Sequence, residues 1–108
     1  MDNIPTVVIS GSGKYMLVSL RKGTEKKLLL RGGGEFKMHK DIITALVIAY
    51  NANFSVQPEG GGQIFFEEIG TKRILVSGES MKYGPPTSQE AVRELLFLKY
   101  PEYQIIVS

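Results

Sequence analysis

The strongest constraint on the fold is a helical pattern that begins directly after a glycine-rich segment. Apolar residues recur there at spacings of three and four: Ile42, Ile43, Leu46, Val47, Ala49 and Tyr50. This spacing predicts an amphipathic or largely buried helix that starts near His39 and stops at Asn51 to Asn53. The three glycines before it, Gly32 to Gly34, are typical of a tight turn.

His39 is the only histidine of the chain, and it falls in the first turn of this predicted helix. Backbone N–H groups are unpaired in a first turn and the helix dipole is positive there, so an anion such as phosphate can dock. The same field favours the neutral, proton-accepting form of an imidazole. The alternative interpretation is that His39 is only a polar cap.

Short extended segments flank the helix. Strands are predicted over residues 6–10, 14–20, 25–31, 63–69, 72–77 and 104–107, with glycine-containing turns between several of them. Another extended segment, 54–57, is expected to break at Pro58 and at the second glycine triplet, Gly60 to Gly62, which is interpreted as a tight turn. Thr87 and Glu90 have capping-box spacing, so a second helix is expected from about Ser88 to Tyr100.

These elements predict one α+β domain over residues 1–108. We expect a single mixed sheet of about six strands with two helices packed on it, in the order βββαββαβ.

Composition excludes several classes of chemistry. The chain has no cysteine, which rules out disulfides, thiolate catalysis and thiolate metal sites. A zinc site would need several carboxylates beside the lone histidine, and no such cluster is visible; Glu67 and Glu68 are neighbours on a strand and point to opposite faces. Neither a signal peptide nor a membrane span is predicted, so the expected location is the cytoplasm.

The charges are unevenly distributed. Residues 1–40 carry eight basic and three acidic residues, a net +5, whereas residues 41–108 have a net −3. A basic field around His39 would attract phosphorylated or acidic partners, although Arg21 to Lys27 are better explained as a solvated hairpin surface. If the strand that Lys14 begins pairs with the strand that Arg31 ends, both cations lie near one sheet edge. Aromatic residues do not alternate with these cations, so nucleic-acid binding is not expected.

Several segments together resemble the Janus/Ocnus family, whose best-known members are small protein-histidine phosphatases. GKYMLV resembles the family's FKYVLI strand, and RGGGEFKMHKDI resembles its R-G-…-H-A-D-I segment with the same arginine-to-histidine spacing. GGGQI, SMKYGP and KYPEY follow in the family's order. The resemblance covers nearly the whole chain beyond the first few residues.

The resemblance implies a hydrolase without metal or cofactor that removes phosphate from phosphohistidine in a protein or peptide. His39 matches the catalytic histidine, as general base or nucleophile, Lys14 the phosphate-binding lysine and Arg31 the supporting arginine. Lys40 is expected to add to phosphate binding. The loop that lines the phosphate site matches Ser80, Met81 and Lys82. The hydroxyl of Ser80 is expected to hold the shape of this loop, and its backbone amide is expected to bind the phosphate.

The chain departs from the family pattern at three positions. Lys40 and Lys82 stand where the family usually has small residues, and Gln63 stands where an arginine is common. Two added lysines would either tighten phosphate binding or adapt the pocket to another anion. The alternative hypothesis is therefore a non-catalytic module that binds a phosphorylated or anionic partner through the same site.

Overall fold

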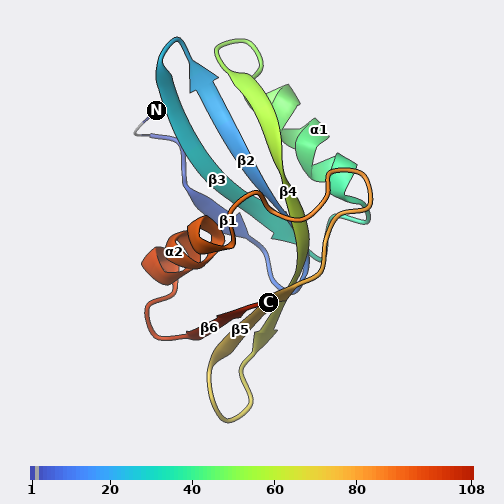
Figure 1. Ribbon diagram of the computed structural model, residues 1–108, viewed down its shortest axis with the longest axis vertical. Helices are drawn as coiled ribbons and strands as arrows, with labels where there is room; N and C mark the ends of the chain where they lie inside the picture. Colours follow the sequence, from blue (N-terminus) through green and yellow to red (C-terminus); the bar gives the residue numbers. More distant parts are fainter. Residues whose placement is uncertain (2) are drawn as a thin grey trace.

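The computed structural model describes Met1 and residues 3–108 and contains six strands and two helices within them (Figure 1). Their bounds are β1 (Val7–Ile9), β2 (Gly13–Lys22), β3 (Glu25–Gly33), α1 (His39–Tyr50), β4 (Ser55–Glu67), β5 (Arg73–Ser77), α2 (Gln89–Lys99) and β6 (Gln104–Val107). The predicted α+β class and the order βββαββαβ are confirmed.

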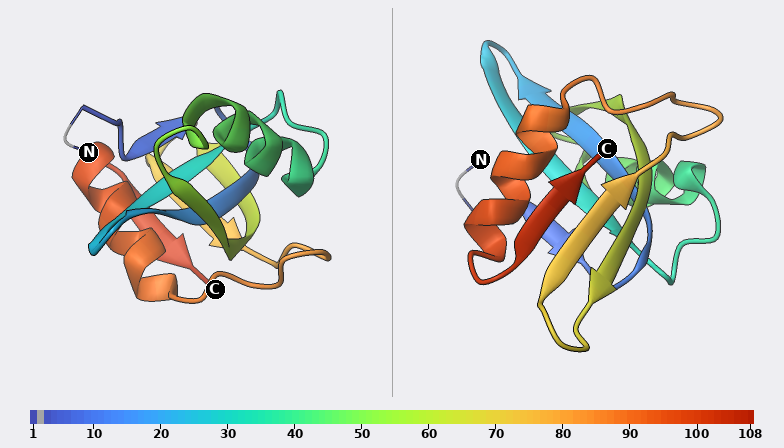
Figure 2. Two further views of the ribbon diagram at one scale, coloured as in Figure 1. Left: turned by 90° about the horizontal axis from the view of Figure 1, so that it is seen from above. Right: turned by 60° about the horizontal axis from the view of Figure 1, so that its bottom comes forward.

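All six strands form one curled, mixed sheet in the spatial order β1-β3-β2-β4-β5-β6. The central pairs β2–β3, β2–β4 and β4–β5 are antiparallel, and the outer pairs β1–β3 and β5–β6 are parallel. The two helices lie on opposite sides of the sheet (Figure 2). Each parallel outer pair is joined through a longer connection, as parallel pairing requires.

Strand β2 supplies both hydrophobic cores because every residue from Tyr15 to Leu20 is buried. Alternate side chains of a strand point to opposite faces, and each face of β2 is covered by one helix. In one core, Tyr15 and Leu17 pack with Val92 and Leu96 of α2. In the other core, Met16 and Val18 pack with Ile42 and Leu46 of α1. The helical pattern that begins after Gly34 therefore identifies the residues that close one of these cores.

The predicted break in the chain at Pro58 and Gly60 to Gly62 is wrong. Strand β4 runs without interruption from Ser55 to Glu67, and the second glycine triplet lies inside it. Its pairing with β2 shifts by one residue, since Met16 pairs with Gly61 but Val18 pairs with Pro58. This β-bulge accommodates Pro58, which has no N–H to give to a regular ladder. The first triplet is also mostly strand, because β3 extends to Gly33.

The caps of the helices differ in part from the prediction. Helix α2 has Ser88 as its N-cap, whose hydroxyl accepts a hydrogen bond from the Ala91 amide at 3.0 Å. Thr87 instead donates its hydroxyl hydrogen to Glu59 at 3.3 Å. Helix α1 begins at His39 and has Asn51 as its C-cap, as predicted.

Candidate functional site

A cavity of about 400 Å³ lies where the start of α1 meets the long loop between β5 and α2, seen beside each other in Figure 1. The residues that line it come from β2, β4, the start of α1 and that loop. They are Lys14, Lys37, Met38, His39, Lys40, Gln63, Glu79, Ser80, Met81 and Lys82. Six of the seven site residues expected from the sequence thus meet at one place.

His39 is a buried lining residue whose ring contacts the backbone of β4. It is 9% exposed, and its Nε2 lies 2.9 Å from the carbonyl oxygen of Gly62 in β4. A carbonyl oxygen only accepts hydrogen bonds, so we assign the hydrogen to Nε2. In the neutral ring, this tautomer leaves the lone pair on Nδ1. The backbone contact across the sheet thus sets the orientation of the ring and leaves Nδ1 able to accept a proton.

Lys14 reaches the cavity from the central strand β2. Its Cα pairs with Gly33 on one side and with Gln63 on the other, so it stands directly beside a second lining residue. The hairpin of β2 with β3 does form, as the sequence suggested.

Ser80 shapes the loop that forms the other wall. It is 2% exposed, its amide donates to the carbonyls of Gly61 and Gly84 at 3.1 Å each, and its hydroxyl accepts from the Tyr83 amide at 3.1 Å. The hydroxyl thus holds the turn, as predicted, but the amide is engaged within the protein and is not directed to a ligand. The adjacent amides of Met81 and Lys82 make no hydrogen bond to another described residue.

The cavity is strongly basic. Four lysines line it, Lys14, Lys37, Lys40 and Lys82, against the single carboxylate of Glu79. Lys40 projects from the first turn of α1, and the Lys82 ammonium lies 5.5 Å from the centre of the Tyr83 ring. Both lysines that depart from the family pattern therefore belong to the site, which favours an anionic ligand.

Arg31 is not part of this cavity. Its guanidinium is buried and donates hydrogen bonds to the backbone carbonyls of Pro5, Thr6 and Leu30. Burial lowers the pKa of Arg31, and the hydroxyl of Tyr50 partly offsets this effect. Arg31 forms no ion pair with the nearby Glu35 in the described part of the chain.

Sequence reasoning missed three lining residues and one hydrogen-bond acceptor. Lys37 and Met38 precede the histidine in the chain, and Glu79 precedes Ser80, so proximity to predicted site residues was an available signal. The carbonyl of Gly62 was not identifiable, because its approach to His39 depends on the position of α1 over β4.

The fold and the cavity define a small α+β protein with one buried, oriented histidine in a lysine-rich pocket. A sequence model of the Janus/Ocnus family (Ocnus) matches residues 1–104, and the chain belongs to this family, which includes the phosphohistidine phosphatases. No curated protein matches the chain. Among residues 1 and 3–108, neither helix is long and apolar enough to cross a membrane.

Proposed function

We propose that this protein is a phosphohydrolase that removes phosphate from phosphohistidine in proteins or peptides, and that it needs no metal or cofactor. The observation that carries the proposal is the buried His39, oriented by Gly62, inside a cavity lined by four lysines. Phosphoryl transfer asks a protein mainly for positioning and for stabilisation of charge on oxygen. Membership of a family that contains such phosphatases supports the same reaction.

In this proposal the phosphoryl oxygens lie between Lys14, Lys40 and Lys82, and the amides of Met81 and Lys82 donate to them. A water molecule attacks phosphorus while Nδ1 of His39 accepts its proton, and the bond from phosphorus to the substrate nitrogen breaks. The released imidazole takes up a proton from solvent. The Nε2–H bond to Gly62 strengthens as the ring becomes positive, which stabilises the transition state.

A second route uses the same atoms in another order. Nδ1 of His39 attacks phosphorus directly while the bond from phosphorus to the substrate nitrogen breaks, and the released imidazole takes up a proton from solvent. Water then cleaves the phosphorylated His39, which regenerates the ring and releases phosphate. Rapid acid-free quenching of a radiolabelled reaction distinguishes the routes, because only the second route transfers label to the protein.

The first test measures phosphate release from a phosphohistidine peptide by phosphorus NMR, with EDTA present. Loss of the base in His39→Ala or His39→Gln is expected to lower turnover by about 100-fold or more. Lys26→Ala, which removes an exposed lysine outside the cavity, is expected to keep wild-type turnover. Wild-type turnover in a folded His39→Ala protein would overturn the proposal.

The presence of Lys40, Lys82 and Gln63 in the cavity favours one alternative, a non-catalytic module for a phosphorylated or anionic partner. In that case the same peptide binds saturably, inorganic phosphate competes with it, and no phosphate is released by either wild type or variant. Turnover by the wild type excludes this alternative.

A further inference from the structure

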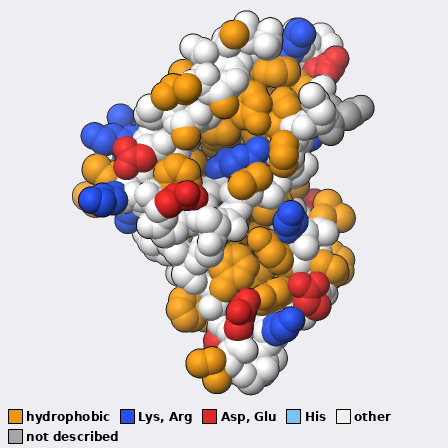
Figure 3. Space-filling view, turned by 180° about the vertical axis from the view of Figure 1, so that it is seen from behind, with side chains coloured by type: hydrophobic (Ala, Val, Ile, Leu, Met, Phe, Trp, Pro, Cys, Tyr) orange, Lys and Arg blue, Asp and Glu red, His pale blue; other side chains and the backbone are white. Residues whose placement is uncertain are grey.

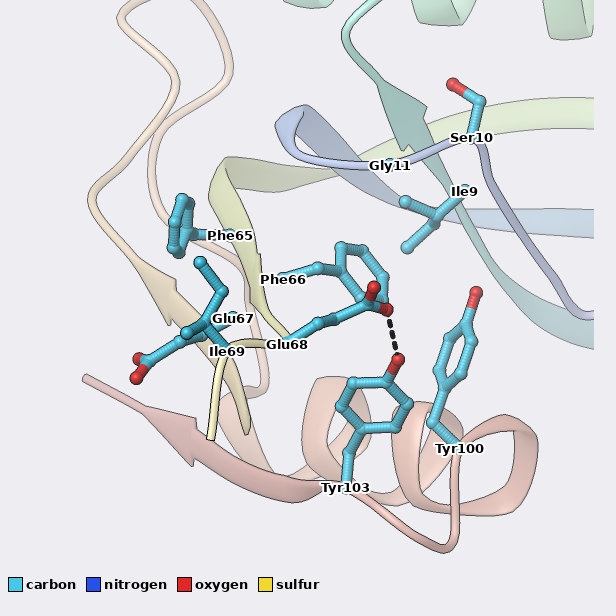
Figure 4. Close-up of a pocket in the computed structure, with 10 residues that line it drawn as sticks. All are labelled: Ile9, Ser10, Gly11, Phe65, Phe66, Glu67, Glu68, Ile69, Tyr100 and Tyr103. Atoms are coloured by element: carbon cyan, nitrogen blue, oxygen red, sulfur yellow. Dashed lines mark hydrogen bonds between the residues drawn. The ribbon is translucent and has the colours of Figure 1, made fainter. Parts of the chain in front are cut away.

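A second and larger cavity, of about 860 Å³, shares no lining residue with the His39 cavity. It lies where the end of β4, the turn after β1 and the segment after α2 come together (Figure 4). The space-filling view shows hydrophobic side chains gathered around the base of the β4–β5 hairpin, with acidic and basic side chains at their margin (Figure 3). The chemistry of this cavity differs from that of the phosphate site because its lining has no lysine or arginine.

Three aromatic rings form one wall. Phe66 meets Tyr100 edge to face at 5.4 Å and Tyr103 at 6.0 Å, and the two tyrosines meet each other at 5.6 Å. Mutually perpendicular rings present a ring face in more than one direction. Such a set of π-faces attracts cations, with arginine and substituted ammonium groups as the usual ligands.

A carboxylate lies at the centre of this aromatic wall. Glu68 turns toward the rings and accepts a hydrogen bond from the Tyr103 hydroxyl, whereas Glu67 points away from them (Figure 4). Glu67 is already paired with Arg73 at 2.8 Å. Glu68 is exposed and has no basic partner among the described residues, so its charge is available to a ligand.

Two further observations indicate a negative potential at this place. The hydrogen bond to Glu68, together with burial and the charges of Glu68 and Glu102, raises the pKa of Tyr103 to about 12. The ring of Tyr103 also already attracts a cation of this chain, since the Lys72 ammonium lies 5.6 Å from its centre. The rings thus interact with positive charge within the protein itself.

We propose that this cavity is a docking site for a basic polypeptide segment, whose arginine or lysine side chain lies against Phe66, Tyr100 and Tyr103 beside the Glu68 carboxylate. The stem of that side chain covers apolar surface while its charged end approaches Glu68. Exposed Phe65 and Ile69, on the side of β4 to which Glu67 points, offer apolar surface beside the rings for neighbouring residues of the partner (Figure 4). The site is separate from the phosphohydrolase chemistry and does not depend on it.

The test titrates isotopically labelled protein with a Gly/Ser peptide that carries interspersed arginines, followed by NMR in the presence of inorganic phosphate to occupy the His39 cavity. The matched control peptide replaces each arginine by citrulline, which keeps the shape and removes the charge. We expect shifts of Phe66, Tyr100 and Tyr103 with the arginine peptide only, and weaker binding as salt rises. Equal binding of the citrulline peptide would show that the site binds apolar surface without recognising positive charge, and would overturn the proposal.

Variants then separate the site from general charge attraction. Glu68→Gln and Tyr100→Leu are each expected to weaken binding by about fivefold or more. Glu35→Gln removes an exposed carboxylate elsewhere and is expected to leave the affinity unchanged. Equal weakening by Glu35→Gln, shifts confined to the His39 cavity, or no binding at all would each contradict the proposal. The shift map of the wild type decides the matter if Tyr100→Leu does not fold.

Discussion

Arg31 shows how a buried cation is stabilised without a carboxylate. Its side chain donates to the carbonyls of Thr6 and Leu30 at 3.0 Å each and to that of Pro5. Burying a charge is unfavourable unless hydrogen bonds replace its hydration, and backbone carbonyls supply them here. The side chain thereby fastens the segment before β1 to β3. Arg31 therefore helps to assemble this edge of the sheet.

Replacing Arg31 by lysine tests this structural role. An ammonium cannot reach three carbonyls in a planar fork, so we expect Arg31→Lys to lower the free energy of unfolding by about 1–3 kcal/mol. The Michaelis constant for a phosphohistidine peptide should stay unchanged. Urea unfolding and steady-state kinetics measure the two effects. Arg21→Lys, at an exposed position of β2, is the matched control and should cost less than about 0.5 kcal/mol.

A raised Michaelis constant in Arg31→Lys with unchanged stability would contradict this role and would return Arg31 to phosphate binding.

At the scale of residues, position along an element was easier to predict than hydrogen-bond partners. The placement of His39 in a first turn and of Lys14 near a strand start followed from the local sequence pattern, whereas the phosphate-binding role of Lys14 was implied by the family resemblance. The acceptors of Arg31 lie about 25 residues away in the chain, at Pro5 and Thr6. Such contacts depend on which strands become neighbours, and the register of strand pairing cannot be predicted from local sequence.

Strand β4 is the element against which the parts of the site are packed. A side chain on Gly60 would meet the Pro85 carbonyl, one on Gly61 would meet the Tyr15 carbonyl, and one on Gly62 would lie 2.5 Å from the Ser77 carbonyl. Three different segments, the loop before α2, strand β2 and the end of β5, thus approach β4 closely at its three consecutive glycines. Because these glycines have no side chains, the loop that contains Ser80 and the strand that contains Lys14 can lie close to the Gly62 carbonyl that contacts His39.

Gly61→Ala tests this close approach. The new Cβ would collide with the β2 backbone and lie 2.7 Å from the Met16 sulfur, so neither strand can remain in place. We expect the free energy of unfolding to fall by about 2 kcal/mol or more, measured by urea unfolding. Ser55→Ala at an exposed position of the same strand should have little effect. A Gly61→Ala protein as stable as wild type would show that the strands are less closely packed.

At the scale of elements, the helices and most strands were predictable because their apolar spacing is local. Pro58 and three glycines have the composition of a turn, and that composition led to the wrong break in β4. The bulge opposite Met16 and Val18 and the close neighbours of the glycines exist only in the assembled sheet. The cap of α2 was misplaced by one residue, from Ser88 to Thr87, because both are good N-caps.

At the scale of the whole molecule, both cores depend on β2 remaining in the middle of the sheet. Tyr15 is 1% exposed and belongs to the core that α2 covers. Burial raises the pKa of its phenol to about 12. Ionisation of this residue is therefore linked to unfolding of the entire protein.

The linkage predicts alkaline destabilisation with a defined direction. In the unfolded chain the Tyr15 phenol loses its proton near pH 10, whereas the folded protein retains it to about pH 12. The free energy of unfolding should therefore be unaffected by this group below pH 10 and fall between pH 10 and about pH 12. It should level off at higher pH, after a total loss of up to about 3 kcal/mol. Urea unfolding at a series of pH values, compared between wild type and Tyr15→Phe, isolates the contribution. The same alkaline decline in both proteins would exclude Tyr15 as its source.

The two outermost strands, β1 and β6, have only three and four residues. A free sheet edge offers N–H and C=O groups to the backbone of another chain, and the number of such groups grows with the length of the edge strand. Helix α2 lies alongside β6, at one of these two edges (Figure 2). Strand addition at β1 or β6 would therefore gain few hydrogen bonds per added molecule, so these two edges resist growth into a fibril.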